Sequence, residues 1–320
     1  MKAIVQTKFG PPEILELQEV ANPIPGENEV LVRIVAASIN YGDKALVKGE
    51  PFLVRLMGYG LFKPKHAIPG GDIAGLVEAV GQNVKQFQPG DAVFGDIGGS
   101  GFGALAEYVA APAEVLALKP ANLTFEEATA VPQAAVVALQ GLRDRGQIQP
   151  GQNVLINGAS GGVGTFAVQI AKAFGAEVTA VCSAKNLDLV RSLGADHVID
   201  YTQTDFTTGA QRYDLIFDIV ANRSLADYLR VLTPQGIYVA CAFKATALLL
   251  GPILSRKKGK KARSLIHKPN QKDLVFMKEL LESGQVKPVI DRCFPLSEVA
   301  EGMRWLENGR HRGKVVILTS

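Results

Sequence analysis

The stretch that most restricts the fold is INGASGGVGTFAVQIAK, residues 156–172, in which a glycine-rich turn joins two patterned segments. The preceding GQNVLI is short and apolar and contains β-branched residues, as a buried strand requires. After the turn, apolar residues recur at helical spacing, namely Phe166, Ala167, Ile170, Ala171 and Phe174. The sequence therefore predicts strand, tight turn and helix in succession, which is the context that makes such a turn a phosphate-binding candidate.

The turn departs from the strict G-x-G-x-x-G spacing, because Ala159 stands at the first position and is followed by Gly161 and Gly164. Two further glycines, Gly158 and Gly162, lie beside these positions. Glycine adopts positive φ without strain and lets a pyrophosphate approach the backbone closely. The helix that follows offers free N–H groups and the positive end of its dipole to an anion. We expect a dinucleotide here, with a plain loop as the alternative.

Strands and helices alternate along the second part of the chain, which predicts a parallel sheet with right-handed crossovers. The alternation begins at Thr124, which with Glu127 forms a capping-box pattern. Before it, short alternating segments broken by Gly and Pro predict a compact β domain. We expect an α/β chain with a β domain over residues 1–123, completed by 266–320, and a doubly wound nucleotide-binding domain over 124–265.

Composition excludes several classes of protein. The net charge of +3 over 320 residues is too mild to indicate nucleic-acid binding. Three cysteines far apart, Cys182, Cys241 and Cys293, form no C-x-x-C pair, which argues against a zinc framework or disulfide scaffold and favours a reducing, cytoplasmic location. We find no apolar run of ~20 residues and no signal-peptide core at the N-terminus, so we expect no membrane span.

The end of the second strand of the nucleotide domain predicts which coenzyme binds. NAD-preferring folds place an Asp or Glu there for the ribose 2′-hydroxyl, but no acid lies between Val178 and Leu187. Ser183 and Lys185 stand there instead, and a hydroxyl and an ammonium would bind the 2′-phosphate that a carboxylate repels. The sequence favours NADPH over NADH, and the alternative is that Lys185 is a surface lysine at the start of a helix.

Long blocks of the chain, in the expected order, resemble the medium-chain dehydrogenase/reductase superfamily. They include AASINYGD, IPGGDIAGLVEAVG, GASGGVGTFAVQIAK and SLGADHVIDY. Within it the chain looks most like the zinc-free quinone oxidoreductase branch, and there like chloroplast-envelope quinone oxidoreductase homologues and mitochondrial reticulon-interacting relatives. The resemblance implies a GroES-like β domain and a Rossmann domain, a C-terminal segment that returns to the first domain, and a homodimer.

The same resemblance shows what is missing. Zinc alcohol dehydrogenases carry a Cys where this chain has Ser38, and Gly-His-Glu where it has Gly70, Gly71 and Asp72. We therefore expect no metal and, from the resemblance, NADPH-dependent hydride transfer to quinones or to the C=C bond of α,β-unsaturated carbonyls. Zinc-free alcohol or carbonyl chemistry is one alternative, and an NADPH-binding scaffold protein with little turnover is another.

The resemblance also assigns candidate site residues. Asn40 is expected beside the nicotinamide and the acceptor, or else as a loop cap. Tyr41 is a proton donor or a lining residue, Tyr59 is a substrate wall or a packing residue, and Asp43 orders the loop.

The expected cofactor residues lie mostly at strand ends. They are Gly158, Ser160, Gly161, Gly162 and Val163 for the pyrophosphate, Ser183, Lys185 and Tyr201 for the 2′-phosphate, Val220, Ala221, Ala242 and Phe243 for the ribose and nicotinamide, and Arg312 from the C-terminal segment. One position departs from the family: Val137 stands where many relatives have Thr, a contact that Gln133 could replace.

A basic segment is left over at residues 248–266, where six of the eight residues from Arg256 to Arg263 are Lys or Arg. It has three interpretations: a solvated loop, a mobile lid whose charges attract the anionic cofactor, or a peripheral contact with anionic lipid. No aromatic residues alternate with the basic ones, which disfavours a nucleic-acid role.

Overall fold

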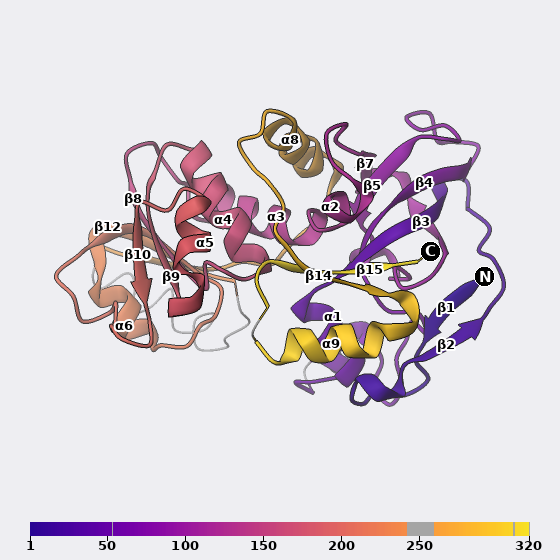
Figure 1. Ribbon diagram of the computed structural model, residues 1–320, viewed down its shortest axis with the longest axis horizontal. Helices are drawn as coiled ribbons and strands as arrows, with labels where there is room; N and C mark the ends of the chain where they lie inside the picture. Colours follow the sequence, from indigo (N-terminus) through magenta and orange to yellow (C-terminus); the bar gives the residue numbers. More distant parts are fainter. Residues whose placement is uncertain (53, 242–258, 310, 320) are drawn as a thin grey trace. The chain divides into compact units, whose positions relative to one another are not determined.

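The computed structural model describes residues 1–52, 54–241, 259–309 and 311–319, with the side chains of residues 57 and 58 left aside, and it divides into two compact units (Figure 1). The first unit comprises Met1–Gln133, Lys268–Glu282 and Pro288–Ser320, and the second comprises Ala134–His267 and Ser283–Lys287. The expected boundaries were 123/124 and 265/266. The structure divides the chain later because α2 (Phe125–Thr129) packs on strands β3 and β4 of the first unit.

The second unit is built on a six-stranded parallel sheet in the order β10-β9-β8-β11-β12-β13. This order is that of a dinucleotide-binding Rossmann sheet, and it confirms the predicted fold class. The strands are β8 (Asn153–Asn157), β9 (Glu177–Cys182), β10 (His197–Asp200), β11 (Tyr213–Asp218), β12 (Leu232–Ala240) and β13 (Lys261–Ser264). The helices are α3 (Pro132–Leu139), which begins in the first unit, α4 (Gly162–Ala173), α5 (Leu187–Ser192) and α6 (Leu225–Arg230), with a π-helical turn at Gln140–Arg145 and a 3₁₀ turn at Ala184–Asn186.

The glycine-rich turn between β8 and α4 brings helix and strand unusually close. Helix α4 packs on β8 and β9 (Figure 1), and its residues from Gly164 to Ala171 are buried. A Cβ on Gly164 would lie 2.1 Å from the carbonyl oxygen of Gly158 and 2.7 Å from the backbone of Ala159. Only glycine fits this contact without movement of the backbone.

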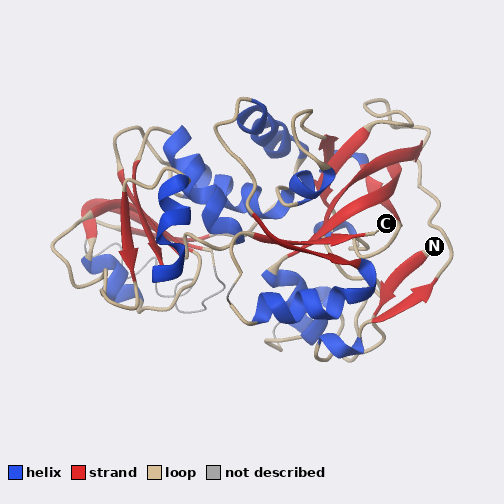
Figure 2. Cartoon of the chain, in the orientation of Figure 1, coloured by secondary structure: helices blue, strands red, loops and turns tan. Residues whose placement is uncertain are grey.

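The first unit is a β domain with α-helices packed around its strands (Figure 2). Its main sheet has the order β14-β15-β3-β4-β5-β7, with β6 paired to β3, and β1 and β2 form a separate antiparallel pair. The strands are β1 (Lys2–Val5), β2 (Glu16–Glu19), β3 (Glu29–Ile39), β4 (Asp72–Val80), β5 (Ala92–Asp96), β6 (Tyr108–Pro112), β7 (Leu116–Leu118), β14 (Ile290–Pro295) and β15 (Lys314–Leu318). The α-helices are α1 (Tyr41–Lys48), α2, α8 (Gln271–Glu282) and α9 (Val299–Glu307).

Three local predictions can be compared with the structure. The capping box is confirmed, because Glu127 N donates to Thr124 Oγ1 at 3.2 Å and Thr124 N donates to Glu127 Oε2 at 2.9 Å. The segment that Asp43 was expected to order as a loop is a helix, because Tyr41–Lys48 forms α1. Asn40 is the N-cap residue of this helix, and its N–H donates to Asp43 Oδ2 at 2.7 Å.

The third concerns the basic segment at 248–266, most of which lies outside the described residues. Its described end is not a solvated loop, since Lys261–Ser264 forms β13 and pairs in parallel with β12. Arg263 adds a side-chain bond to the carbonyl of Arg145 at 2.5 Å. No helix in the described ranges combines the length and hydropathy that a bilayer crossing needs.

We predict that Gly164→Ala destabilises the protein by about 1–3 kcal/mol, because its Cβ overlaps the backbone of the turn. Helix propensity alone predicts the opposite sign, since Ala is better than Gly inside a helix. Urea unfolding of both proteins measures the difference. Gly161→Ala is the matched control, because its Cβ would meet nothing closer than 3.6 Å. A Gly164→Ala protein as stable as the parent would contradict the steric argument.

Candidate active site

The carboxyl ends of the parallel strands gather most of the predicted cofactor residues of the second unit at one edge of its sheet. Gly158 has φ 90° and its N–H donates to Val181 O at 3.1 Å, which seats the turn after β8 against β9. Ser160, Gly161, Gly162 and Val163 follow and are only half-buried, so this surface is open to a ligand. The first N–H groups of α4 have no acceptor within the helix and would bind an anion here.

The end of β9 carries the residues expected to bind a 2′-phosphate. Ser183 is half-buried and directly precedes the 3₁₀ turn Ala184–Asn186, which follows the strand. Lys185 is exposed and lies within that turn. Asn186, in the same turn, is buried and was not predicted as a site residue. Its Nδ2 donates to Ser160 Oγ at 2.9 Å and to Ser183 Oγ at 3.4 Å. The turns after β8 and β9 are therefore joined by one side chain.

The neighbouring strand ends complete this edge. Tyr201 follows β10 and is 46% exposed, and Val220 follows β11 and is 51% exposed. Ala221 is buried with φ 55°, and its N–H donates to Asp218 Oδ1 at 2.8 Å. Val220 also reaches the glycine turn, since a Cβ on Gly158 would lie 2.6 Å from Val220 Cγ2. Ala242 and Phe243 lie outside the described residues.

A buried hydrogen-bond network that the sequence did not reveal holds these strand ends. Asp218, fully buried at the end of β11, accepts from Asn157 Nδ2 at 2.9 Å and from the hydroxyl of Tyr238 at 2.7 Å. Asn157 also donates to the hydroxyl of Tyr228 at 3.0 Å. Burial, with the charge of Asp218 nearby, raises the pKa of the Cys241 thiol to about 12, so this cysteine stays protonated.

The first unit contains a second polar cluster, buried where α1, β3, β4 and β15 meet. Lys314 begins β15 with its side chain 3% exposed, and its Nζ lies 3.1 Å from Asp72 Oδ2 at the start of β4. The same Nζ donates to Asn40 Oδ1, and Asn40 Nδ2 donates to Asp72 Oδ2 at 2.8 Å. Ser38 Oγ lies 3.0 Å from Asp72 Oδ2 and 2.9 Å from Thr129 O, and its single hydrogen can be donated to either acceptor. Asn40 was predicted, whereas Lys314 was missed.

This cluster fixes the amide of Asn40. Its Oδ1 accepts from the ammonium of Lys314, and its Nδ2 donates to Asp72. Among the described residues, Asp72 is the only acceptor of a hydrogen bond from this Nδ2, which carries two hydrogens. Asn40 is buried, with 8% of its surface exposed. Burial raises the pKa of Asp72, and the ammonium of Lys314 opposes that shift. The arrangement is a fixed, neutral hydrogen-bond donor beside a buried positive charge.

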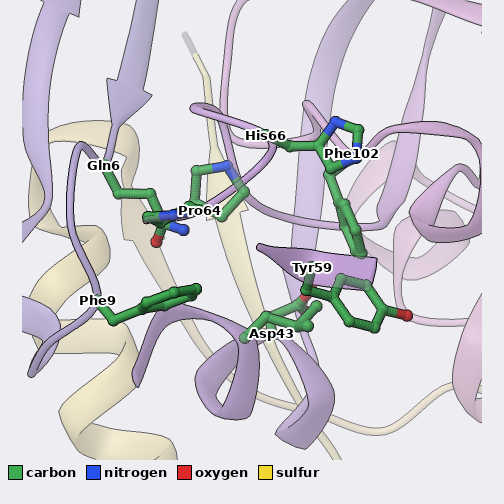
Figure 3. Close-up of a pocket in the computed structure, with 9 residues that line it drawn as sticks. Gln6, Phe9, Asp43, Tyr59, Pro64, His66 and Phe102 are labelled. Carbon is green, nitrogen blue, oxygen red and sulfur yellow. The ribbon is translucent and has the colours of Figure 1, made fainter. Parts of the chain in front are cut away.

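Tyr59 lines a small pocket of the first unit, together with Phe9, Phe102 and Asp43 (Figure 3). Figure 3 shows Phe9 and Gln6 on one side and Tyr59 and Phe102 on the other. The rings of Tyr59 and Phe102 are tilted, with centroids 5.8 Å apart. The cavity volume is about 20 Å³, enough for one ordered water molecule. The geometry is compatible with a substrate wall and with packing.

The remaining candidates are Tyr41, Arg312, Val137 and Gln133. Tyr41 is 62% exposed, with Lys44 Nζ 4.7 Å from its ring centroid. Arg312 precedes β15 and belongs to the first unit, so its contact with the cofactor stays a prediction. Val137 and Gln133 both lie in α3. Gln133 N donates to Asp72 Oδ1 at 2.9 Å, which ties it to the polar cluster through its backbone.

Comparisons with known proteins agree with this architecture. The family model described as "Alcohol dehydrogenase GroES-like domain" matches residues 26–121, and the one described as "Zinc-binding dehydrogenase" matches residues 193–317. Together they match parts of both units.

Similar proteins match nearly the whole chain. The chain is 38% identical to a tomato (Solanum lycopersicum) 2-methylene-furan-3-one reductase, over 99% of this chain and 79% of the relative. It is 33% identical to the chloroplastic NADPH-dependent alkenal/one oxidoreductase of Arabidopsis thaliana, with the same coverage. A solved quinone oxidoreductase from Coxiella burnetii superposes with a TM-score of 0.90 at 30% identity, over 100% of this chain and 99% of that one.

We predict that Lys314→Met destabilises the protein by about 3–5 kcal/mol, because it leaves the Asp72 carboxylate buried without its cation. The double variant with Asp72→Asn should recover much of that loss. Urea unfolding measures both. Arg33→Met breaks an exposed ion pair with Glu78 and should have a much smaller effect. Failure of Asp72→Asn to rescue the single variant would show that the charge pair is not the cause.

A second prediction concerns Asp43, whose pKa burial raises from its ordinary value of 3.8 to about 7. The charges that also act on it are those of Asp72, Lys314 and Asp96. Because the folded-state pKa is the higher one, folding favours the protonated form. This contribution to stability is complete below about pH 4 and is lost as the pH rises to about 7.

Asp43→Asn removes this titration. Relative to the parent, the variant should gain stability between about pH 4 and pH 7, by at most about 1.4 kcal/mol per pH unit, with no further change above about pH 8. Denaturant unfolding at several pH values measures the difference. Asp188→Asn is the control, because the Asp188 side chain is 99% exposed. Parallel pH profiles for parent and Asp43→Asn would refute the prediction.

Proposed function

The chain belongs to the quinone oxidoreductase branch of the medium-chain dehydrogenase/reductase family, and we propose that it transfers hydride from NADPH to quinones or to the C=C bond of α,β-unsaturated carbonyls. The names of the relatives support this acceptor class: a furanone reductase, an alkenal/one oxidoreductase and a quinone oxidoreductase. The single structural observation that carries the proposal is the Asn40 amide, held beside the buried Lys314 ammonium.

The sheet edge of the second unit supports a phosphorylated dinucleotide. The open glycine turn and the start of α4 suit a pyrophosphate. After β9, a hydroxyl and an ammonium, from Ser183 and Lys185, stand where an NAD-specific fold has a carboxylate. Tyr201, exposed at the next strand end, is a further candidate contact for the 2′-phosphate. We therefore propose NADPH as the coenzyme.

The donors around Asp72 do not suit zinc. Ser38 offers a hydroxyl, Asn40 an amide and Lys314 an ammonium, and the ammonium already pairs with the carboxylate. Zinc sites use thiolate, imidazole and carboxylate ligands, and a divalent cation here would also face the charge of Lys314. In the described ranges no three His, Cys, Asp or Glu side chains are placed to hold a metal ion. We propose a metal-independent reaction.

The chemistry assigned to the chain's own residues is electrostatic. When bound, the reduced coenzyme supplies a hydride. Negative charge then develops on the carbonyl oxygen of the acceptor, and a fixed N–H donor stabilises that charge without reorganising. The second N–H of the Asn40 amide, which has no acceptor among the described residues, is the donor that we propose, and Lys314 and Asp72 hold its orientation. Tyr41, exposed beside it, is the proposed proton donor to the α-carbon of an enone.

Other parts of the proposal rest on the resemblance or the composition. A homodimer is expected from the family, and a cytoplasmic, reducing location from three cysteines that are all free thiols in the structure. Contact of residues 248–266 with a membrane stays a prediction, since most of that segment lies outside the described residues.

An acceptor screen tests the function directly. Purified protein should oxidise NADPH in the presence of 1,4-benzoquinone, 9,10-phenanthrenequinone or a 2-alkenal, and should oxidise NADH less efficiently. Product identification then separates quinone reduction from reduction of a C=C bond. Tight NADPH binding without turnover across the panel would favour a binding protein and would overturn the proposal.

We predict that Asn40→Ala lowers kcat for these acceptors by about 10²- to 10³-fold, the usual effect of removing one donor to a developing oxyanion. Its Kd for NADPH should change by less than about threefold. Steady-state kinetics and calorimetry measure the two quantities, with a thermal melt to confirm folding. Tyr41→Phe in parallel tests the proton donor. An Asn40→Ala enzyme with the parental kcat would exclude Asn40 from the reaction.

A further inference from the structure

Asn186 is a buried polar side chain that the function proposed above does not use. It is 4% exposed and lies in the 3₁₀ turn after β9. Its Nδ2 lies 2.9 Å from the hydroxyl oxygen of Ser160 and 3.4 Å from that of Ser183. Its backbone is fixed as well, because its N–H donates to Ser183 O at 2.9 Å. One rigid amide thus touches two hydroxyls that stand at the ends of adjacent parallel strands.

The amide of Asn186 restricts which hydrogen bonds the two serine hydroxyls can make. A hydroxyl can both donate and accept, whereas an amide nitrogen only donates. Because Asn186 donates to both oxygens, each serine must use its own hydrogen elsewhere. Within the described ranges neither hydroxyl donates to a protein acceptor. Both hydrogens are therefore left for a ligand that accepts hydrogen bonds, as a phosphate does.

The unsatisfied atom of Asn186 supports this orientation. Its Oδ1 is buried and has no hydrogen-bond partner in the described part of the chain. In the reverse orientation Oδ1 would accept from both serines, and the NH₂ group would be buried with two unsatisfied donors. A buried carbonyl left without a donor is the more tolerable of the two. The amide therefore stabilises the serines as donors.

We infer that Asn186 is the positioning residue that makes this site specific for a 2′-phosphate, by holding the hydroxyls of Ser160 and Ser183 as a pair of donors to it. The inference assigns Ser160 to the 2′-phosphate, whereas the resemblance assigned it to the pyrophosphate. The inference rests on the proposed coenzyme and adds to it a determinant that does not touch the phosphate itself. A carboxylate of the same shape at this position would accept hydrogen bonds from both serine hydroxyls, so neither could donate to the phosphate. Its negative charge would also repel the phosphate.

Asn186→Asp tests the inference, because it keeps the shape and reverses the hydrogen-bonding role. Calorimetry should show its Kd for NADPH raised by about 10- to 100-fold, as expected for lost charge-assisted hydrogen bonds. Its Kd for NADH should change by less than about threefold. Equal weakening of both coenzymes would indicate a merely structural role and would overturn the inference, as would no change in either.

Two further variants keep the test decisive if Asn186→Asp folds poorly. Gln211→Glu is the charge control. It adds the same negative charge just before β11, at the amino ends of the parallel strands and away from the proposed coenzyme, and it should leave both Kd values unchanged. Asn186→Ala removes the amide without adding charge. It should weaken NADPH binding by about 3- to 10-fold and leave NADH binding unchanged. Thermal melts identify any variant that is misfolded.

Coupling between the residues gives an independent measure. Ser160→Ala should weaken NADPH binding about tenfold in the parent and hardly at all in the Asn186→Asp background, where that hydroxyl no longer donates to phosphate. Equal effects in both backgrounds would overturn the inference. A parent protein that binds NADPH and NADH alike would instead overturn the proposed coenzyme, which is a separate result.

Discussion

A charge that leaves water must find a partner, and the first unit is organised around one such partnership, between Lys314 and Asp72. The two residues begin β15 and β4. Asn40, before the first residue of α1, contacts both of them, and Ser38, near the end of β3, lies within hydrogen-bond distance of Asp72. Four elements therefore meet at one ion pair. The orientation of the Asn40 amide is fixed, because its oxygen accepts from the ammonium of Lys314 and its nitrogen donates to the carboxylate of Asp72.

The second unit also contains a buried carboxylate, that of Asp218, and there the described partners are hydrogen-bond donors rather than a cation. Asp218 is as deeply buried as Asp72, but the donors to its oxygens among the described residues are neutral: the amide of Asn157, the N–H of Ala221 and the hydroxyl of Tyr238. These donors come from three neighbouring parts of the sheet edge, so the carboxylate joins the ends of β8, β11 and β12. Hydrogen bonds to a charged acceptor are stronger than neutral ones, and here they hold the turns that face the proposed coenzyme.

The parts of the fold that were predicted are those whose signal is local. The turn at Gly158 lies between a strand and a helix that each carry their own periodicity, and the capping box at Thr124 spans four residues. Helix α1 was missed because its glycine and charges interrupt the apolar pattern. Lys314 was missed because its partner lies 242 residues away in sequence, so that only the folded sheet reveals the pair. A lysine at the head of the apolar strand KVVIL was the one available signal. Asn186 gave none, since AKNL resembles an ordinary helix start.

The long separation of Asp72 from Lys314 has a consequence for biosynthesis. Residues 134–267 of the second unit lie between them in sequence. During translation, strands β8 to β13 of that unit are synthesised after Asp72 and before Lys314. Until the last strand of the first unit emerges, Asp72 has no cation and stays hydrated or protonated. Synthesis of the second unit is therefore complete before the first unit has all of its strands. The ion pair that orients the Asn40 amide can form only after Lys314 has been added.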